Sequence, residues 1–522
     1  MDPVVEFRSV SKSFHGVMAN ENINLCVQKG SIHAIVGENG AGKSTAMKVL
    51  YGTHQPDSGE IYICGKLWGR KGQPWASPFD AIQNGIGMVH QHFMLADPVS
   101  VLDNILLGQE RVSQSFSLLP SFLRQIDRKS IRNQLDQIAS QYGMHVDWDA
   151  KIEDLSVGVQ QRIEILKLLY RQTQILILDE PTAVLTPQEA TDLFKQLRGL
   201  AEQGKTVLMI THKLKEVMDV ADRVSVFRGG HVVGEREIQN TSVEDLATLM
   251  VGRKMNLTVQ IPAQQRSKEP ILELSKVSLN AHRSLHDLDF EVYGGEIVGI
   301  SGVEGNGQAE LLQLLLHPSD FHRDFQGSIH IRHGNSRTDI RHLSAAEIRM
   351  LGVGVIPDDR HRDGLLLKKS VRENFLLGLQ RRKPFYDRGL ISEGKLDQAV
   401  RTAIEEFDIR PKSLEIESEN LSGGNQQKLI IAREFKFSPK LLIAAQPTRG
   451  VDIGAIETIH NRMIRARSEG SAILLISSEL DEILELSDRI LMFYGGRIVE
   501  EFKRNEVNEQ VLGLRMGGLY AK

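Results

Sequence analysis

Nine consecutive residues near the start of the chain have the types and the spacing to bind phosphate. They are Gly37, Glu38, Asn39, Gly40, Ala41, Gly42, Lys43, Ser44 and Thr45, and the first eight read G-x-x-x-x-G-K-[ST]. The glycines let the backbone approach a phosphate closely, and N–H groups at the start of a helix favour negative charge. We expect Lys43 to reach the β- and γ-phosphates and Ser44 to hold Mg²⁺.

The flanking segments predict the elements that must position this loop. The apolar run 32–36 predicts a buried strand before it, and residues 45–51 predict a helix after it. Two further apolar runs, 175–178 and 206–210, predict strands that end close to polar residues. The first is followed by the carboxylates Asp179 and Glu180, and the second by His212. Alternating strands and helices predict a largely parallel sheet with helices on its faces.

Composition limits the classes of function. The 522 residues carry a net charge of −4, so no overall positive field favours nucleic acid. The two cysteines, Cys26 and Cys64, are too few for a disulfide framework or a four-cysteine zinc site. We expect no signal peptide, because residues 1–6 lack the basic-then-apolar pattern of one. We expect no membrane helix, because no apolar run approaches ~18 residues. Any work at a membrane is therefore expected to depend on partners.

The chain repeats itself after roughly 266 residues. The glycine spacing of the first loop recurs from Gly302, and the segment 155–161 recurs as 421–427. The segments 179–182 and 210–212 recur at the same offset, as 445–448 and 476–478. The repeat predicts a tandem duplication, with a first domain over 1–259, a polar linker over 260–270 and a second domain over 271–522.

These motifs resemble the ATP-binding cassette family in its fused two-cassette form. The resemblance rests on the phosphate loop, on Gln91 and His212, on the run 175–182, and on 421–427, which reads LSGGNQQ. It covers nearly the whole chain. It implies an α/β fold of two nucleotide-binding domains, each a RecA-like mixed sheet with helices, an antiparallel β part and a helical subdomain.

The resemblance also assigns roles at one site in the first half. Asp179, together with Ser44 and Gln91, is expected to hold Mg²⁺, and Glu180 is the candidate general base for the attacking water. His212 is expected to contact the γ-phosphate of ATP, although a histidine at a strand end can also be an ordinary surface residue. Phe14 is placed to stack on adenine, and an ordinary core phenylalanine is an equally good interpretation.

The second half is expected to complete this site through pairing of the two cassettes within the chain. The contributing residues are Ser422, Gly423, Gly424, Gln426 and Asp452. The reciprocal site has lost its chemistry, because uncharged or altered residues replace the lysine, the metal ligand, both carboxylates, the histidine and the glutamine. These replacements are Gln308, Ala309, Ala445, Gln446, Ser478 and Asp358. We therefore expect ATP hydrolysis at one site per chain, while the remaining glycines leave nucleotide binding at the second site open.

The resemblance implies the energising subunit of an importer at the cytoplasmic face of the inner membrane. Two integral-membrane permease subunits and an extracytoplasmic substrate-binding lipoprotein are the expected partners. The segments 89–95 and 155–167 look most like the nucleoside type, while a monosaccharide or riboflavin as cargo stays open. A soluble tandem cassette protein acting on ribosomes or DNA is disfavoured by the short linker and the degenerate site. The charged segment 358–364 resembles a metal cluster but occupies the switch-loop position, which is our interpretation of it.

Overall fold

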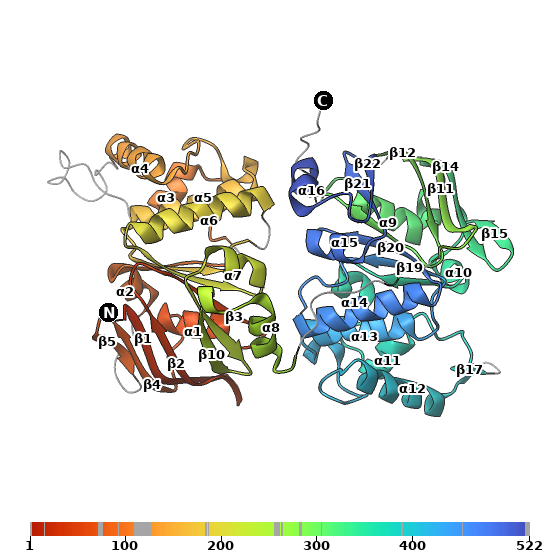
Figure 1. Ribbon diagram of the computed structural model, residues 1–522, viewed down its shortest axis with the longest axis horizontal. Coiled ribbons are helices and arrows are strands. Elements are labelled where there is room, and N and C mark those ends of the chain that lie inside the picture. The colour runs from red at the N-terminus through yellow and green to blue at the C-terminus, as the bar shows by residue number, and fades with distance from the viewer. Residues whose placement is uncertain are drawn as a thin grey trace. The chain divides into compact units, whose positions relative to one another are not determined.

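The computed structural model forms two compact units, Met1–Met255 and Asn256–Lys522 (Figure 1). It describes residues 3–14, 16–70, 77–91, 93–108, 127–182, 185, 187–254, 262, 265–280, 284–303, 305–387, 390–451 and 453–516. Asp452, an expected member of the nucleotide site, lies outside these residues, as does part of the predicted linker. The linker bounds therefore stay a prediction.

The first unit contains an antiparallel sheet with the strand order β2-β1-β4-β5. Its strands are β1 (Val5–Phe14), β2 (Val17–Val27), β4 (Ser58–Ile63) and β5 (Lys66–Arg70). At the start of β1 the buried Val5 and Phe7 alternate with the less buried Glu6 and Arg8, which is the pattern of a sheet with one solvated face. Figure 1 shows these strands at one end of the unit and α3 (Val101–Leu106) and α4 (Arg128–Tyr142) at the other.

A second, six-stranded sheet of the first unit positions the predicted chemistry. Its order is β10-β9-β3-β8-β7-β6, with every neighbouring pair parallel except β9 and β10. The strands are β3 (Ile32–Gly37), β6 (Ile86–Val89), β7 (Ile175–Asp179), β8 (Thr206–Thr211), β9 (Arg223–Arg228) and β10 (His231–Glu237). All residues of β3, β6, β7 and β8 are buried, as expected for parallel strands covered on both faces. The strands predicted at 32–36, 175–178 and 206–210 are confirmed.

Helices connect these strands in the order that the sequence predicts. The other helices of the first unit are α1 (Lys43–Leu50), α2 (Pro78–Gln83), α5 (Val157–Tyr170), α6 (Pro187–Glu202), α7 (Leu214–Val220) and α8 (Val243–Val251). The helix expected at 45–51 is therefore α1, which begins two residues earlier, at the lysine of the phosphate loop. In the part of the chain that the structure describes, no helix is both long and apolar enough to cross a membrane.

The second unit repeats both sheets. The antiparallel sheet has the order β12-β11-β14-β15, and the mixed sheet has the order β16-β19-β20-β13-β21-β22. Their strands are β11 (Pro270–Leu279), β12 (Leu285–Tyr293), β13 (Ile297–Ser301), β14 (Phe325–His333), β15 (Ser336–Asp339), β16 (Val353–Ile356), β19 (Leu441–Ala445), β20 (Ala472–Ser477), β21 (Arg489–Tyr494) and β22 (Arg497–Lys503). Read from β22 to β16, the mixed sheet has the same strand order as the sheet of the first unit read from β10 to β6. The equal strand orders confirm the duplicated α/β fold.

The helices of the second unit also follow the first. They are α9 (Gln308–Leu316), α10 (Ala345–Met350), α11 (Val371–Leu376), α12 (Glu393–Glu406), α13 (Gly423–Phe435), α14 (Ile453–Ser468), α15 (Leu480–Leu486) and α16 (Glu509–Met516). Between α11 and α12, in the helical subdomain that the resemblance implies, lies a short hairpin of β17 (Tyr386–Asp387) and β18 (Leu390–Ile391). Figure 1 shows α11 and α12 at the end of this unit opposite β11, β12 and β14.

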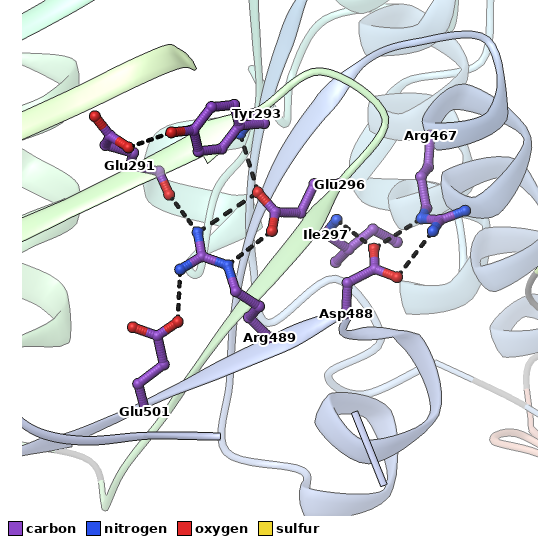
Figure 2. Close-up of polar contacts among 8 residues, drawn as sticks. All are labelled: Glu291, Tyr293, Glu296, Ile297, Arg467, Asp488, Arg489 and Glu501. Carbon is purple, nitrogen blue, oxygen red and sulfur yellow. Dashed lines mark hydrogen bonds and ion pairs between the residues drawn. The ribbon is translucent and has the colours of Figure 1, made fainter. Parts of the chain in front are cut away.

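A polar network fixes the starts of β13 and β21 in the second unit (Figure 2). The guanidinium of Arg489 pairs with Glu296 at 2.7 Å and with Glu501 at 2.7 Å. Asp488 accepts from both sides of the Arg467 guanidinium and from the backbone N–H of Ile297. The first unit has the same arrangement, in which Asp222 accepts from Arg198 and from the N–H of Ile32. The network fixes the central strands relative to each other, upstream of the loops that carry the chemistry.

A buried histidine in β3 gives the first unit a predicted pH dependence. His33 is fully buried against the Ser225 hydroxyl at 2.8 Å, and burial lowers its pKa to about 3. The unfolded chain binds a proton near pH 6.5 while the folded unit does not, so stability falls as the pH falls through this window. The expected slope is up to ~1.4 kcal/mol per pH unit. Thermal unfolding of the His33→Gln chain between pH 7 and 4 should show a smaller slope, and the exposed His231→Gln should leave it unchanged.

Candidate active site

The phosphate loop of the first unit requires glycine at three positions, Gly37, Gly40 and Gly42. Gly40 and Gly42 have φ angles of +80° and +96°, and α1 begins directly after Gly42. A Cβ on Gly42 would lie 2.3 Å from the Ala19 carbonyl oxygen, and one on Gly37 would lie 2.4 Å from that of Phe227. The loop is therefore held against β2 and β9 by close backbone contact, as a cradle for phosphate requires.

The lysine of this loop is buried, and its amine is bonded to the loop itself. Lys43 Nζ donates to the carbonyl oxygens of Gly37 at 2.7 Å and Glu38 at 3.0 Å. Burial lowers the pKa of Lys43, and the nearby carboxylates Glu180 and Asp179 act in the opposite direction. The amine is thus held where the loop would surround a phosphate.

The carboxylates that follow β7 lie beside this loop. The Ser44 hydroxyl donates to Asp179 at 3.2 Å, which brings together two oxygen ligands predicted for a metal. Burial raises the pKa of Asp179, so a cation at these oxygens would offset the desolvation of its carboxylate. Ser44, Asp179 and the loop are therefore assembled as the sequence predicts, with oxygen ligands of the kind that Mg²⁺ prefers.

The predicted base and histidine contact each other directly. His212 Nδ1 lies 3.0 Å from Glu180 Oε1, and Gln91 Nε2 donates to Glu180 Oε2 at 3.3 Å. The hydrogen bond from His212 is the largest influence on Glu180 and lowers the pKa of its carboxyl. Glu180 also has a φ of +48°, in the left-handed region, and its N–H donates to Ile210. Three loops, which follow β6, β7 and β8, thereby meet at one carboxylate.

The aromatic residue predicted to contact adenine is on the surface. Phe14 ends β1 with 36% of its surface exposed, so the alternative interpretation as a core residue is wrong. Its ring meets that of His54 edge-on at 5.1 Å, and Lys12 Nζ lies 5.2 Å from its centre. The accessible ring is compatible with stacking, and the contact with adenine stays a prediction.

In the second unit the predicted signature begins a helix. Ser422 caps α13 by accepting from the Asn425 N–H at 3.4 Å and from the Asn425 side chain at 2.8 Å. Gly423 and Gly424 form the first turn of the helix. Gln426 is buried and donates to Ser418, while its oxygen lies 2.9 Å from His361 Nε2. Each atom of the Gln426 amide keeps one further hydrogen-bonding position, and its contact with nucleotide stays a prediction.

The degenerate loop of the second unit keeps the geometry of the first without its charges. Gln308 Nε2 donates to the Val303 carbonyl at 3.2 Å, and its Oε1 accepts from the Asn306 N–H. Gln446 has a φ of +46° and accepts from both the N–H and the hydroxyl of Ser478. Neutral amides therefore occupy the places of Lys43 and Glu180, and neither can supply a cation or a general base.

The sequence did not predict two residues that contact the nucleotide-binding loops, Asn20 and Arg360. Asn20, in β2, is buried and donates to the carbonyl oxygen of Gly42 at 3.0 Å, which supports the phosphate loop from below. Arg360, within the segment 358–364, lies against Gly423. Among the described residues, which include 358–364, no group of three or more His, Cys, Asp or Glu could hold a metal ion. The charge pattern of 358–364 was the available signal, and only the fold shows what it faces.

The paired sheets and the loop–carboxylate–histidine arrangement define a tandem phosphate-loop nucleotide hydrolase. The family model described as ABC transporter matches residues 20–183 and again 285–449. The nucleoside import ATP-binding protein NupA of Lactococcus lactis is 42% identical over 99% of this chain and 98% of its own length. The guanosine import ATP-binding protein NupO of Bacillus subtilis is 44% identical over the same shares. The glucose import ATP-binding protein TsgD13 of Haloferax volcanii is 40% identical over 99% of this chain and 96% of its own length.

The chain therefore belongs to the ABC transporter family and consists of two fused ATP-binding cassettes. It is an ATPase subunit of an import system.

Proposed function

We propose that this chain energises the import of nucleosides by hydrolysing ATP at one composite site. The observation that carries the proposal is the meeting of Lys43, Ser44, Asp179, Glu180 and His212 around one loop. The corresponding residues of the second unit form an uncharged copy of the same geometry. Hydrolysis at one site per chain follows from this asymmetry.

The first cassette supplies the groups for phosphoryl transfer to water. Ser44 and Asp179, with Gln91, would hold Mg²⁺, which neutralises charge on the β- and γ-phosphates when bound. Lys43 and the N–H groups at the start of α1 bind and orient the phosphates. Glu180, kept ionised by the hydrogen bond from His212, accepts the proton of the attacking water. The contacts from Gln91 and His212 orient the Glu180 carboxylate and connect it to the loops that follow β6 and β8.

The second cassette is proposed to complete the site from across the pair. Ser422 and the backbone N–H groups of Gly423 and Gly424 begin a 13-residue helix, whose N-terminus favours a γ-phosphate. Asp452 is proposed to act from the adjoining loop. Because both cassettes are in one chain, their pairing does not depend on dilution, and effective concentrations are on the order of mM for short flexible linkers.

The proposed partners are two integral-membrane permeases, which dock near Gln91 and Asp358, and an extracytoplasmic substrate-binding lipoprotein. Membrane association then occurs only through the permeases, at the cytoplasmic face of the inner membrane. Nucleosides are the proposed cargo because two relatives above 40% identity are named for nucleoside and guanosine import. The relative named for glucose import supports a monosaccharide as the second candidate.

The cargo is tested by ATPase activity of the chain assembled with its permeases and binding protein. Addition of nucleosides, pentoses, hexoses and riboflavin is expected to stimulate turnover with nucleosides alone, because cargo must reach the site through the binding protein. Stimulation by a sugar or by riboflavin would keep the transport ATPase and overturn the cargo. Undiminished activity in the isolated chain, with no stimulation by any solute, would instead favour the soluble tandem cassette.

A further inference from the structure

The switch segment of the second unit places an arginine against the signature loop. Arg360 follows Asp358, the counterpart of Gln91, and begins a single turn, Arg360–Gly364, that Asp359 caps. A Cβ on Gly423 would lie 2.6 Å from Arg360 Nη2, and one on Gly450 would lie 3.5 Å from it. The guanidinium therefore lies between the first turn of α13 and the turn at Gly450.

One hydrogen bond fixes this position. Arg360 Nη1 donates to the carbonyl oxygen of Arg449 at 3.0 Å. Arg360 Nε is buried and has no partner among the residues that the structure describes, although a buried donor ordinarily finds one. Burial lowers the pKa of Arg360, and Asp359 is the carboxylate that opposes this effect. The half-buried guanidinium of Arg360 therefore lies at the start of α13 with a buried donor unused, and packing alone does not explain this placement.

The neighbouring histidine makes a parallel connection. His361 Nε2 lies 2.9 Å from Gln426 Oε1, one turn further along α13. Consecutive residues of the switch segment thus contact consecutive turns of the signature helix. Arg449, whose carbonyl oxygen accepts from Arg360, also pairs through its side chain with Asp358 at 3.2 Å. Arg449 is therefore bonded to the switch segment through both its backbone and its side chain. These contacts link the switch segment to the signature and to the turn at Gly450.

The first unit offers an internal comparison. Its signature has Val157 at the position of Gly423, and the residue in the switch region nearest to the place of Arg360 is Phe93. A valine side chain would occupy the space that the guanidinium needs, since even a single Cβ would approach it to 2.6 Å. The glycine and the arginine are therefore present together in the second unit, and both are absent at the corresponding positions of the first unit.

We propose that Arg360 is a positioning residue for ATP hydrolysis, which holds the Ser422–Gly423 backbone in the geometry that receives the γ-phosphate. The inference rests on the proposed function, because it requires that this signature serve the site at Lys43. Arg360 acts through Gly423 and the Arg449 carbonyl. A displacement of the switch segment after Asp358 is thereby transmitted to the signature of the second cassette. This transmission links the permease side of the second cassette to hydrolysis of the ATP that is bound at the first cassette.

The test uses the full chain and its complex with the permeases, with Arg362→Ala as the matched control. Arg362 is exposed, lies two residues away, and its guanidinium pairs with the neighbouring Asp363. Arg360→Ala is expected to lower kcat at least tenfold while KM for ATP and the unfolding midpoint stay unchanged. Arg360→Lys should be intermediate, because an ammonium keeps the charge without the planar fork. A kcat equal to that of Arg362→Ala, or a loss explained by reduced stability, would overturn the inference.

A double-mutant cycle separates positioning from a general loss at the signature. Gly423→Ala displaces the guanidinium by steric contact, so Arg360→Ala added to it should lower kcat little further. Arg362→Ala added to Gly423→Ala should show only the effect of Gly423→Ala. Full multiplication of the Arg360→Ala and Gly423→Ala losses would refute the inference. Lys43→Ala distinguishes the two proposals: turnover that survives it defeats the proposed site itself, whereas its loss together with a normal Arg360→Ala chain defeats only the role of Arg360.

Discussion

A Glu180→Gln chain is expected to bind ATP and to lose turnover by roughly 10²–10⁴-fold. The amide keeps the shape of the side chain and its left-handed backbone, and Gln446 shows that glutamine adopts this conformation in the second unit, with a φ of +46°. It cannot accept the proton of the attacking water. The measurement is steady-state phosphate release at saturating ATP, alongside direct binding of ATP to the same preparation.

The second unit provides the control. Gln446→Ala alters the equivalent position of the uncharged copy, where the side chain bonds to Ser478. Turnover should therefore stay close to that of the parent, as expected for a residue that takes no part in proton transfer. Equal losses from both variants would show that hydrolysis is not confined to the first site. Undiminished turnover in Glu180→Gln would remove Glu180 as the base.

The asymmetry behind this prediction could be recognised in the sequence because it depends on residue types at fixed spacing. Loss of a lysine, a carboxylate and a histidine is visible in the sequence itself, at Gln308, Gln446 and Ser478. The strand–loop–helix context was equally predictable, since buried parallel strands are continuous apolar runs. What the sequence could not show was that Gln446 and Ser478 rebuild the contact of Glu180 and His212. That result depends on tertiary placement of two strand ends.

Long-range side-chain contacts were the other feature that spacing could not predict. Asn20 lies 22 residues before Gly42 and supports its carbonyl, but an asparagine in a predicted strand has no local signal for this role. The segment 358–364 was interpretable as a charged switch loop, whereas the approach of Arg360 to Gly423 requires two loops more than 60 residues apart to meet. Periodicity identifies elements and their buried faces, and it is silent about which polar side chains meet at their ends.

A Glu434→Ala chain is expected to lose about 3–5 kcal/mol of stability in the second unit, since removal of one partner leaves buried charge uncompensated. The carboxylate of Glu434 accepts from Arg349 at 2.9 and 3.0 Å, from Arg433 at 2.8 Å and from the N–H of Val355 at 3.0 Å. Arg433 and Glu434 are almost fully buried. Burial opposes ionisation, but Arg433 and Arg349 outweigh it and lower the pKa of Glu434.

The effect should appear as faster hydrogen exchange in β16 and α13 of the full chain, because Glu434 joins these two elements through Val355. Glu415→Ala is the matched control, since this carboxylate is 70% exposed and lies 3.7 Å from Arg372. Such surface pairs contribute about 0–1 kcal/mol. Glu434→Gln should fall between the two, because the amide oxygen still accepts hydrogen bonds but its charge is lost. Equal protection in Glu434→Ala and Glu415→Ala would mean that Arg349 and Arg433 find other acceptors, and the core of the second unit would then not depend on this carboxylate.

The lowered pKa of Glu434 in the folded chain also determines how its contribution to stability changes with pH. The contribution is present above the usual carboxyl pKa and is lost as the pH falls, so the difference in stability between Glu434→Ala and the parent should shrink in acid.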